Sequence, residues 1–191
     1  PMPLPVLQVL VASTRPQRVG RAVADWFLPI AEAHGGFTVE LVDLAEVALP
    51  MFDEPRHPML GQYEHQHTKD WSATVSRADA FVFVMPEYNH GYNAALKNAL
   101  DLVSKEWAHK PVGAVSYGGI AAGTRAWQAL KPVLNVLRMT PVVEGVHIPM
   151  VAKQVEEGRF AGTDQMAKAA TAMLDALQQM TEALRPLRDK T

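Results

Sequence analysis

One short apolar run, at residues 81–85, constrains the fold of this chain more than any other stretch. The run is too short for a globular helix, and its aromatic and β-branched residues are typical of a strand buried on both faces. Pro86 ends the run, a polar loop follows at residues 87–91, and Asn93 is placed to cap a helix. This order predicts the central strand of an open parallel sheet, with a binding site in the loop beyond its carboxyl end.

The remaining segments repeat this alternation of strand and helix. Apolar runs predict four more strands, at residues 4–12, 37–44, 112–116 and 140–143. Helical periodicity predicts helices at residues 19–33, 63–78, 94–103, 125–137 and 163–184, with a long surface loop at 48–61 and irregular chain at 144–162. We therefore expect an α/β fold, a three-layer flavodoxin-like sandwich whose five-stranded parallel sheet has the order 2-1-3-4-5.

Individual residues predict where several helices begin and end. The pair Gly35 and Gly36 should stop the first helix, and Thr124 should cap the helix that follows the fourth strand. Pro132 should kink that helix, and Pro186 should mark the end of the last one.

The composition limits the classes of protein to which the chain can belong. Its 191 residues fit one domain, which we place at 1–191. A net charge of −2 and the lack of a long apolar run argue against nucleic-acid and membrane partners. The chain has no cysteine, which excludes disulfides and fits a reducing compartment, so we expect a cytoplasmic protein. His57, His65 and His67 lack the arrangement of a metal site, and no metal is expected.

The loop after the first strand predicts an anion site. Ser13, Thr14, Arg15 and Arg18 precede a helix whose first amides point outward, so hydroxyls, guanidinium groups and helix dipole should converge on one spot. The spacing matches neither the dinucleotide glycine pattern nor a Walker A loop, and it favours a phosphate held without a metal ion. An ordinary capped helix with surface arginines is the alternative.

Two further loops suit a flat heteroaromatic ring. Residues 87–91 offer backbone amides, the Tyr88 ring and the Asn89 amide. Across the predicted crevice, Gly118 and Gly119 follow Tyr117 and let backbone approach a ligand closely. A phosphate at one end and a ring at the other describe a mononucleotide such as FMN, although a plain strand exit and a plain turn explain each loop alone.

These motifs together resemble the NADPH-dependent FMN reductase family. The resemblance rests on Ser-Thr-Arg-Pro-x-Arg at residues 13–18, on Pro-Glu-Tyr-Asn at 86–89 followed by Leu-Lys-Asn-Ala-Leu-Asp at 96–101, and on Ser-Tyr-Gly-Gly at 116–119. The three motifs occur in the family's order, and the resemblance covers residues 4–184.

The resemblance implies an activity, a cofactor and a site. It implies that FMN passes a hydride from NADPH or NADH through flavin N5 to a flavin, quinone or similar small-molecule acceptor by a ping-pong mechanism, within a homodimer or homotetramer. No side chain is then catalytic, because the flavin carries the chemistry. Combined with the loop analysis, the expected cofactor-binding residues are Ser13, Thr14, Arg15, Arg18, Val19, Gly20, Pro86, Glu87, Tyr88, Asn89, His90, Ser116, Tyr117, Gly118 and Gly119.

Several roles stay open at the level of sequence. Glu87 is expected to point away from the flavin, where its charge would oppose the reduced ring. Arg125 is either a contact for the nicotinamide nucleotide's phosphate or a surface or interface arginine, and His90 either steers acceptor protonation or is an ordinary loop histidine. A flavodoxin-type electron carrier or regulatory flavoprotein without NAD(P)H turnover is the alternative function, and a nucleotide-binding module without flavin is a third.

Overall fold

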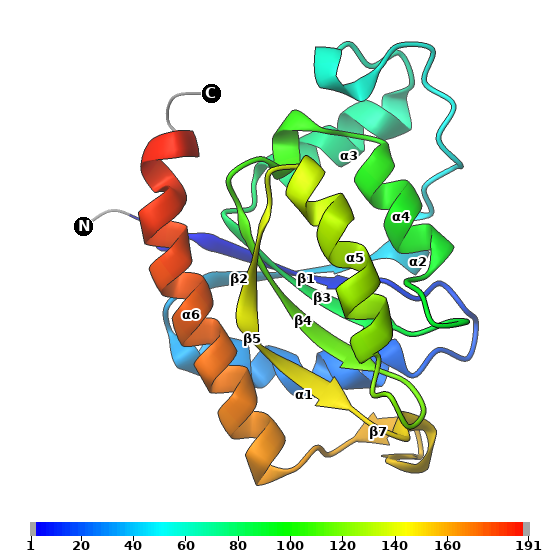
Figure 1. Cartoon of the computed structure of the whole chain (residues 1–191), viewed down its shortest axis with the longest axis vertical. Coiled ribbons are helices and arrows are strands. Elements are labelled where there is room, and N and C mark those ends of the chain that lie inside the picture. Colours follow the sequence, from blue (N-terminus) through cyan, green and yellow to red (C-terminus); the bar gives the residue numbers. More distant parts are fainter. Residues whose placement is uncertain (1–2, 189–191) are drawn as a thin grey trace.

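A computed structural model describes residues 3–188 as a three-layer sandwich around one parallel sheet (Figure 1). Its five strands pair in the order β2-β1-β3-β4-β5, and every pairing in this sheet is parallel. The predicted fold class and strand order are confirmed. Within residues 3–188, no helix has both the length and the apolar character needed to cross a membrane.

The elements follow one another in the predicted alternation. The strands are β1 Val6–Val11, β2 Thr38–Asp43, β3 Ala80–Pro86, β4 Pro111–Tyr117, β5 Thr140–Ile148, β6 Val155–Glu156 and β7 Arg159–Phe160. The α-helices are α1 Gly20–His34, α2 Leu44–Val47, α3 Gln66–Ser76, α4 Ala94–Asp101, α5 Thr124–Val136 and α6 Asp164–Arg188. Short 3-10 turns are η1 Pro58–Leu60, η2 Lys105–Trp107 and η3 Val151–Lys153.

The sheet separates two apolar cores, because successive side chains of a strand point to opposite faces. Val82 and Val84 of β3 pack with α1 and α6, whereas Phe81 and Phe83 pack with α3, α4 and α5. All of β3 is buried, as expected for the central strand. Trp107 lies fully inside the second core, beside Phe81.

The structure differs from the sequence prediction after the fourth strand. β5 continues to Ile148 instead of stopping at Val143, and β6 and β7 form a small antiparallel hairpin inside the stretch predicted to be irregular. The longer pairing of β5 with β4 contains a register shift, which breaks the simple apolar pattern that short strands show. The last helix runs through Pro186 to Arg188.

Two predicted helix caps have other roles. Asn93 stands at the N-cap position of α4, but its side chain donates to the carbonyl of Ala12 at 2.7 Å instead of capping the helix. Gly123, with φ of 79°, is the N-cap of α5, and the hydroxyl of Thr124 donates to the carbonyl of Ala121. Gly35 ends α1 in the left-handed conformation, as predicted.

The long loop between β2 and α3 is held by hydrogen bonds from a side chain of α4 and from a side chain of the loop itself. The amide of Asn98 on α4 accepts from the Phe52 N–H and donates to the Pro50 carbonyl, at 2.8 Å each. The carboxylate of Glu54, within the loop, accepts from the backbone amides of Glu64 and His65 just before α3. The loop therefore has a defined path although it contains little regular structure.

Replacing Asn98 by alanine should release this loop. Asn98 is nearly buried, and its loss leaves two backbone groups without their partner, so we expect a cost of about 1–3 kcal/mol in the free energy of unfolding. Urea unfolding checks the cost, and limited proteolysis should cut the Asn98→Ala variant within residues 48–61 before the wild type. Asn135→Ala, at an exposed site, is the matched control, and equal proteolysis of all three proteins would contradict this role of Asn98.

Candidate functional site

Three loops leave the same edge of the sheet because β1, β3 and β4 are adjacent and parallel. Val11 is in register with Val84, and Pro86 is in register with Tyr117. The loops that begin at residues 13, 87 and 118 therefore meet beyond the carboxyl ends of these strands. This is the place where open α/β sheets bind ligands.

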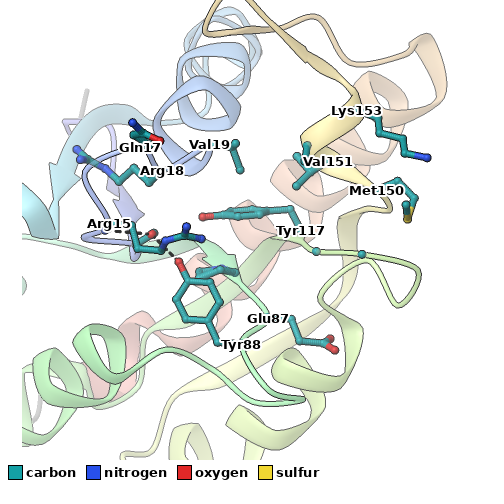
Figure 2. Close-up of a pocket in the computed structure, with 15 residues that line it drawn as sticks. Arg15, Gln17, Arg18, Val19, Glu87, Tyr88, Tyr117, Met150, Val151 and Lys153 are labelled. Carbon is teal, nitrogen blue, oxygen red and sulfur yellow. Dashed lines mark hydrogen bonds between the residues drawn. The ribbon is translucent and has the colours of Figure 1, made fainter.

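The three loops border a cavity of about 400 Å³ (Figure 2). Its lining combines hydroxyls, cations and apolar groups from both halves of the chain. The lining residues are Ser13, Arg15, Gln17, Arg18, Val19, Pro86, Glu87, Tyr88, Tyr117, Gly118, Gly119, Met150, Val151, Ala152 and Lys153.

At one end of the cavity, hydroxyls lie near the start of α1. The Ser13 and Tyr88 hydroxyls are 2.8 Å apart and hydrogen-bonded, and the Arg15 guanidinium lies 6.0 Å from the centre of the Tyr88 ring. The N-cap position of α1 is Val19, which offers no side-chain acceptor to the first-turn amides. Amides left without a cap at a helix start bind anions well.

Arg18 lines the cavity but already has an anionic partner. Its Nη2 lies 2.5 Å from the Asp43 carboxylate, which is buried at the end of β2 and also caps α2 through the amide of Ala45. Arg21 shares the same carboxylate at 3.3 Å. The Arg18 Nε is buried without a partner among the described residues, so this guanidinium is held in place with one donor still unused.

The loop after β3 forms a tight turn. Tyr88 and Gly91 exchange two backbone hydrogen bonds, and the central residues Asn89 and His90 have φ of 50° and 65°. Positive φ at both central positions is the pattern of a type I′ turn, and asparagine adopts it readily. Both central side chains are exposed and lie outside the cavity lining, so their contacts with a cofactor stay a prediction.

Glu87 forms an ion pair with Arg125 at the cavity rim. Arg125 Nε lies 2.5 Å from Glu87 Oε1, and the Glu87 side chain is only 6% exposed. The other carboxylate oxygen, Oε2, is buried without a partner among the described residues. The carboxylate engages the Arg125 Nε, and the role of Arg125 as a contact for a nucleotide phosphate stays a prediction.

One predicted residue, Ser116, lies beneath the lining and acts through its neighbours. Ser116 is fully buried, and its hydroxyl donates to the carbonyl of Ala122 at 2.8 Å and lies 2.6 Å from Nδ1 of His147. Burial lowers the pKa of His147, and the charge of Lys131 lowers it further, so the ring favours its neutral form. Ser116 therefore stabilises the loop that contains Gly118 through its hydrogen bond to Ala122.

Of the other predicted residues, Thr14 is exposed and borders a different hollow, next to α2 and α4. Gly20 packs against the Tyr117 ring, because a Cβ added there would lie 2.4 Å from the Tyr117 hydroxyl. Both stay predictions as cofactor ligands.

The sequence prediction missed one wall of the cavity. Gln17, inside the predicted phosphate loop, also lines the cavity, although the sequence offered no reason to assign it a role. Met150, Val151, Ala152 and Lys153 come from the turn after β5, which the sequence predicted to be irregular. Met150 has a φ of 47°, and its amide donates to the Gly119 carbonyl at 2.9 Å, so this turn is fastened to the Gly118 loop.

The residues present fit FMN at this cavity. The uncapped start of α1, the hydroxyls and Arg15 match a phosphate. Gly119 has open space beside it, where a ring can approach the backbone, and Gly118 lets the loop pack closely on Gly123, since a Cβ there would lie 3.2 Å from the Gly123 amide. By contrast, the described residues contain no group of three side chains able to hold a metal ion, and His65 and His67 stack on each other.

The comparison with known structures defines the class of fold. The flavoenzyme NAD(P)H:(acceptor) oxidoreductase FerB from Paracoccus denitrificans superposes with a TM-score of 0.73, covering 94% of this chain and 98% of that one, at 20% sequence identity. The fold is therefore flavodoxin-like, with the cavity at the position where such sheets hold their ligand.

The comparison with known sequences defines the family. The NADPH-dependent FMN reductase family matches residues 6–153. An NAD(P)H-dependent FMN reductase of Schizosaccharomyces pombe is 41% identical over 149 residues, 76% of this chain and 74% of the relative. An NADPH azoreductase of Bacillus sp. is 31% identical over 151 residues, 74% of this chain and 79% of the relative. The chain belongs to the NADPH-dependent FMN reductase family, and it is an NAD(P)H-dependent flavin oxidoreductase.

Replacing Arg15 by alanine should weaken the binding of FMN more than that of riboflavin. Arg15 is exposed and makes no ion pair within the described residues, so its removal should cost little stability, while the loss of one charge-assisted contact lowers affinity about tenfold. Fluorescence titration measures both affinities. Arg77→Ala is the control, because Arg77 is exposed at the end of α3, pairs with Glu40 and lies outside the cavity lining. Unchanged FMN affinity in Arg15→Ala would contradict the phosphate site.

Proposed function

We propose that the cavity binds FMN with its phosphate at the start of α1 and its ring between the loops that follow β3 and β4. The observation that carries this proposal is the convergence of the Ser13 and Tyr88 hydroxyls, Arg15 and the uncapped helix start at one end of a cavity with a glycine loop at the other. The described ion pairs of Arg18 and Glu87 fix the two walls between these ends.

When bound, FMN supplies the hydride exchange between NAD(P)H and an electron acceptor. The residues of this chain bind and orient it: the first loop holds the phosphate, and the Gly118 loop allows close approach of backbone amides. Preorganised amides stabilise negative charge that develops on a ligand. The Glu87 carboxylate is partly neutralised by Arg125, which limits its opposition to such charge.

We propose a ping-pong order, in which NAD(P)H and the acceptor use the cavity in turn. Support comes from the chemical range of the relatives, whose names include a flavin reductase and an azoreductase. In a ping-pong order the oxidised nicotinamide nucleotide leaves before the acceptor binds, so the site needs few contacts that are specific to one acceptor. The acceptor is thus proposed to be a small molecule such as a flavin or quinone. Separately, we propose a cytoplasmic location, because a chain without cysteine fits a reducing compartment.

We also propose that the chain forms a homodimer or homotetramer through exposed apolar side chains of the loop between β2 and α3, the loop surface formed by Met51, Phe52, Met59 and Leu60. Met51 is 73% exposed and Met59 is 60% exposed. Asn98 and Glu54 hold this loop in one conformation, so its apolar side chains are presented to solvent without being free to fold inward. Exposed apolar patches of this kind mark interaction sites.

An anaerobic absorbance spectrum of the purified protein with FMN tests the main proposal. We expect flavin bands that bleach after one equivalent of NADPH or NADH and return when a quinone is added. Bands that persist after NADPH and NADH would favour a flavodoxin-type electron carrier. The absence of bound flavin at saturating FMN would contradict the assignment of the cavity.

Charged substitutions on the loop surface should break the oligomer. Met51→Lys combined with Leu60→Lys places two cations on the proposed contact, and light scattering at tens of micromolar protein should then report a monomer. Val143→Lys is the matched control, because Val143 is 91% exposed on the edge strand β5, outside the loop surface. A wild-type monomer, or an oligomer that survives the double substitution, would contradict this interface.

A further inference from the structure

The Tyr117 side chain extends from the end of β4 across to the opposite side of the cavity. Tyr117 is the last residue of β4, yet its hydroxyl lies against the first residue of α1, where a Cβ added to Gly20 would be 2.4 Å away. Figure 2 shows the ring extending from the end of β4 toward Val19, with Arg15 nearby. The strand that precedes the ring-binding loop thus supplies a polar group to the phosphate end.

The neighbours of this hydroxyl belong to the phosphate loop. The Tyr117 side chain lines the cavity although the residue is only 4% exposed. Burial raises its pKa above the ordinary range; the Tyr88 hydroxyl adds to this increase, whereas Ser13, Arg18 and Arg15 oppose it. The hydroxyl therefore keeps its proton at neutral and moderately alkaline pH and remains available as a donor.

We propose that the Tyr117 hydroxyl donates a hydrogen bond to the phosphate of FMN and makes the site select phosphorylated flavins over riboflavin. This inference rests on the proposed binding of FMN and assigns one further ligand within it. A neutral donor held by burial gains a charge-assisted hydrogen bond when it meets a phosphate oxygen. It also explains the glycine at position 20, because any side chain there would displace the hydroxyl.

The alternative role for Tyr117 is contact with the flavin ring. Riboflavin and FMN carry the same ring and differ in the phosphate, so a ring contact affects both ligands equally. A phosphate contact affects FMN alone. The ratio of the two affinities therefore separates the two roles.

The first experiment compares FMN and riboflavin binding to wild type and Tyr117→Phe by fluorescence titration. We expect the affinity for FMN to fall about tenfold and that for riboflavin to stay within about twofold, because a hydrogen bond to a charged group is lost only with FMN. Tyr92→Phe is the matched control: it removes a tyrosine hydroxyl near the second loop but outside the cavity lining, and should leave the ratio unchanged.

A second experiment tests the position of the hydroxyl without any ligand. In wild type, Gly20→Ala should lower the melting temperature, since the new Cβ collides with the Tyr117 hydroxyl at 2.4 Å. In the Tyr117→Phe background that atom is absent and the nearest ring carbon, Cζ, is 3.2 Å away, so the same substitution should lower the melting temperature less than in wild type. Equal effects in both backgrounds would overturn the placement.

The outcomes distinguish failure of this inference from failure of the proposed function. If wild type binds neither flavin, the proposed binding of FMN is wrong, and the inference about Tyr117 is wrong with it. If wild type binds FMN but Tyr117→Phe lowers both affinities equally, or neither, only the phosphate role of Tyr117 is overturned. A selective loss of FMN affinity supports both.

Discussion

The parallel pairing of β1 with β3 is the constraint on which the site depends. These strands are far apart in the sequence, yet Val11 lies in register with Val84, and the Ala12 amide donates to the Val84 carbonyl at 3.0 Å. The buried Asn93 amide then donates to the Ala12 carbonyl, which ties the exit of the first strand to the start of α4. The first two loops are thereby fixed against each other before any ligand contributes, and a phosphate and a ring can be held at a set distance.

Half of the charged side chains that line the cavity are already paired. Arg18 is held by Asp43, and Glu87 is held by Arg125, so among the lining residues Arg15 and Lys153 are the cations without a described ion pair. A phosphate bound as proposed would therefore have these two cations available. Neutral donors, the hydroxyls and the amides of the α1 start, lie at the same end of the cavity, and their placement costs nothing in repulsion when no anion is bound.

The elements that position the site follow from local sequence patterns, whereas one wall does not. The apolar run of β3 and the glycine stop of α1 depend on nearby residues, so periodicity and turn chemistry predict them. The turn at Met150 takes its shape from backbone bonds to the distant Gly119 loop, and no local pattern encodes that contact. The Asn93 side chain bonds a carbonyl 81 positions away, which is why a local capping rule misassigned it.

The direction of the Tyr117 side chain also cannot be predicted from sequence patterns. Its position gives a packing reason for the glycine at position 20. Gly20 leaves room for the Tyr117 hydroxyl, and Gly123, at φ of 79°, packs against the Tyr117 backbone, where an added Cβ would lie 2.7 Å from its amide nitrogen. Tyr117 therefore packs against the start of α1 through its side chain and against the start of α5 through its backbone. The exposed His90 and Lys153 have no such constraint. The side chains at these two exposed positions can therefore be replaced without disturbing the packing around Tyr117.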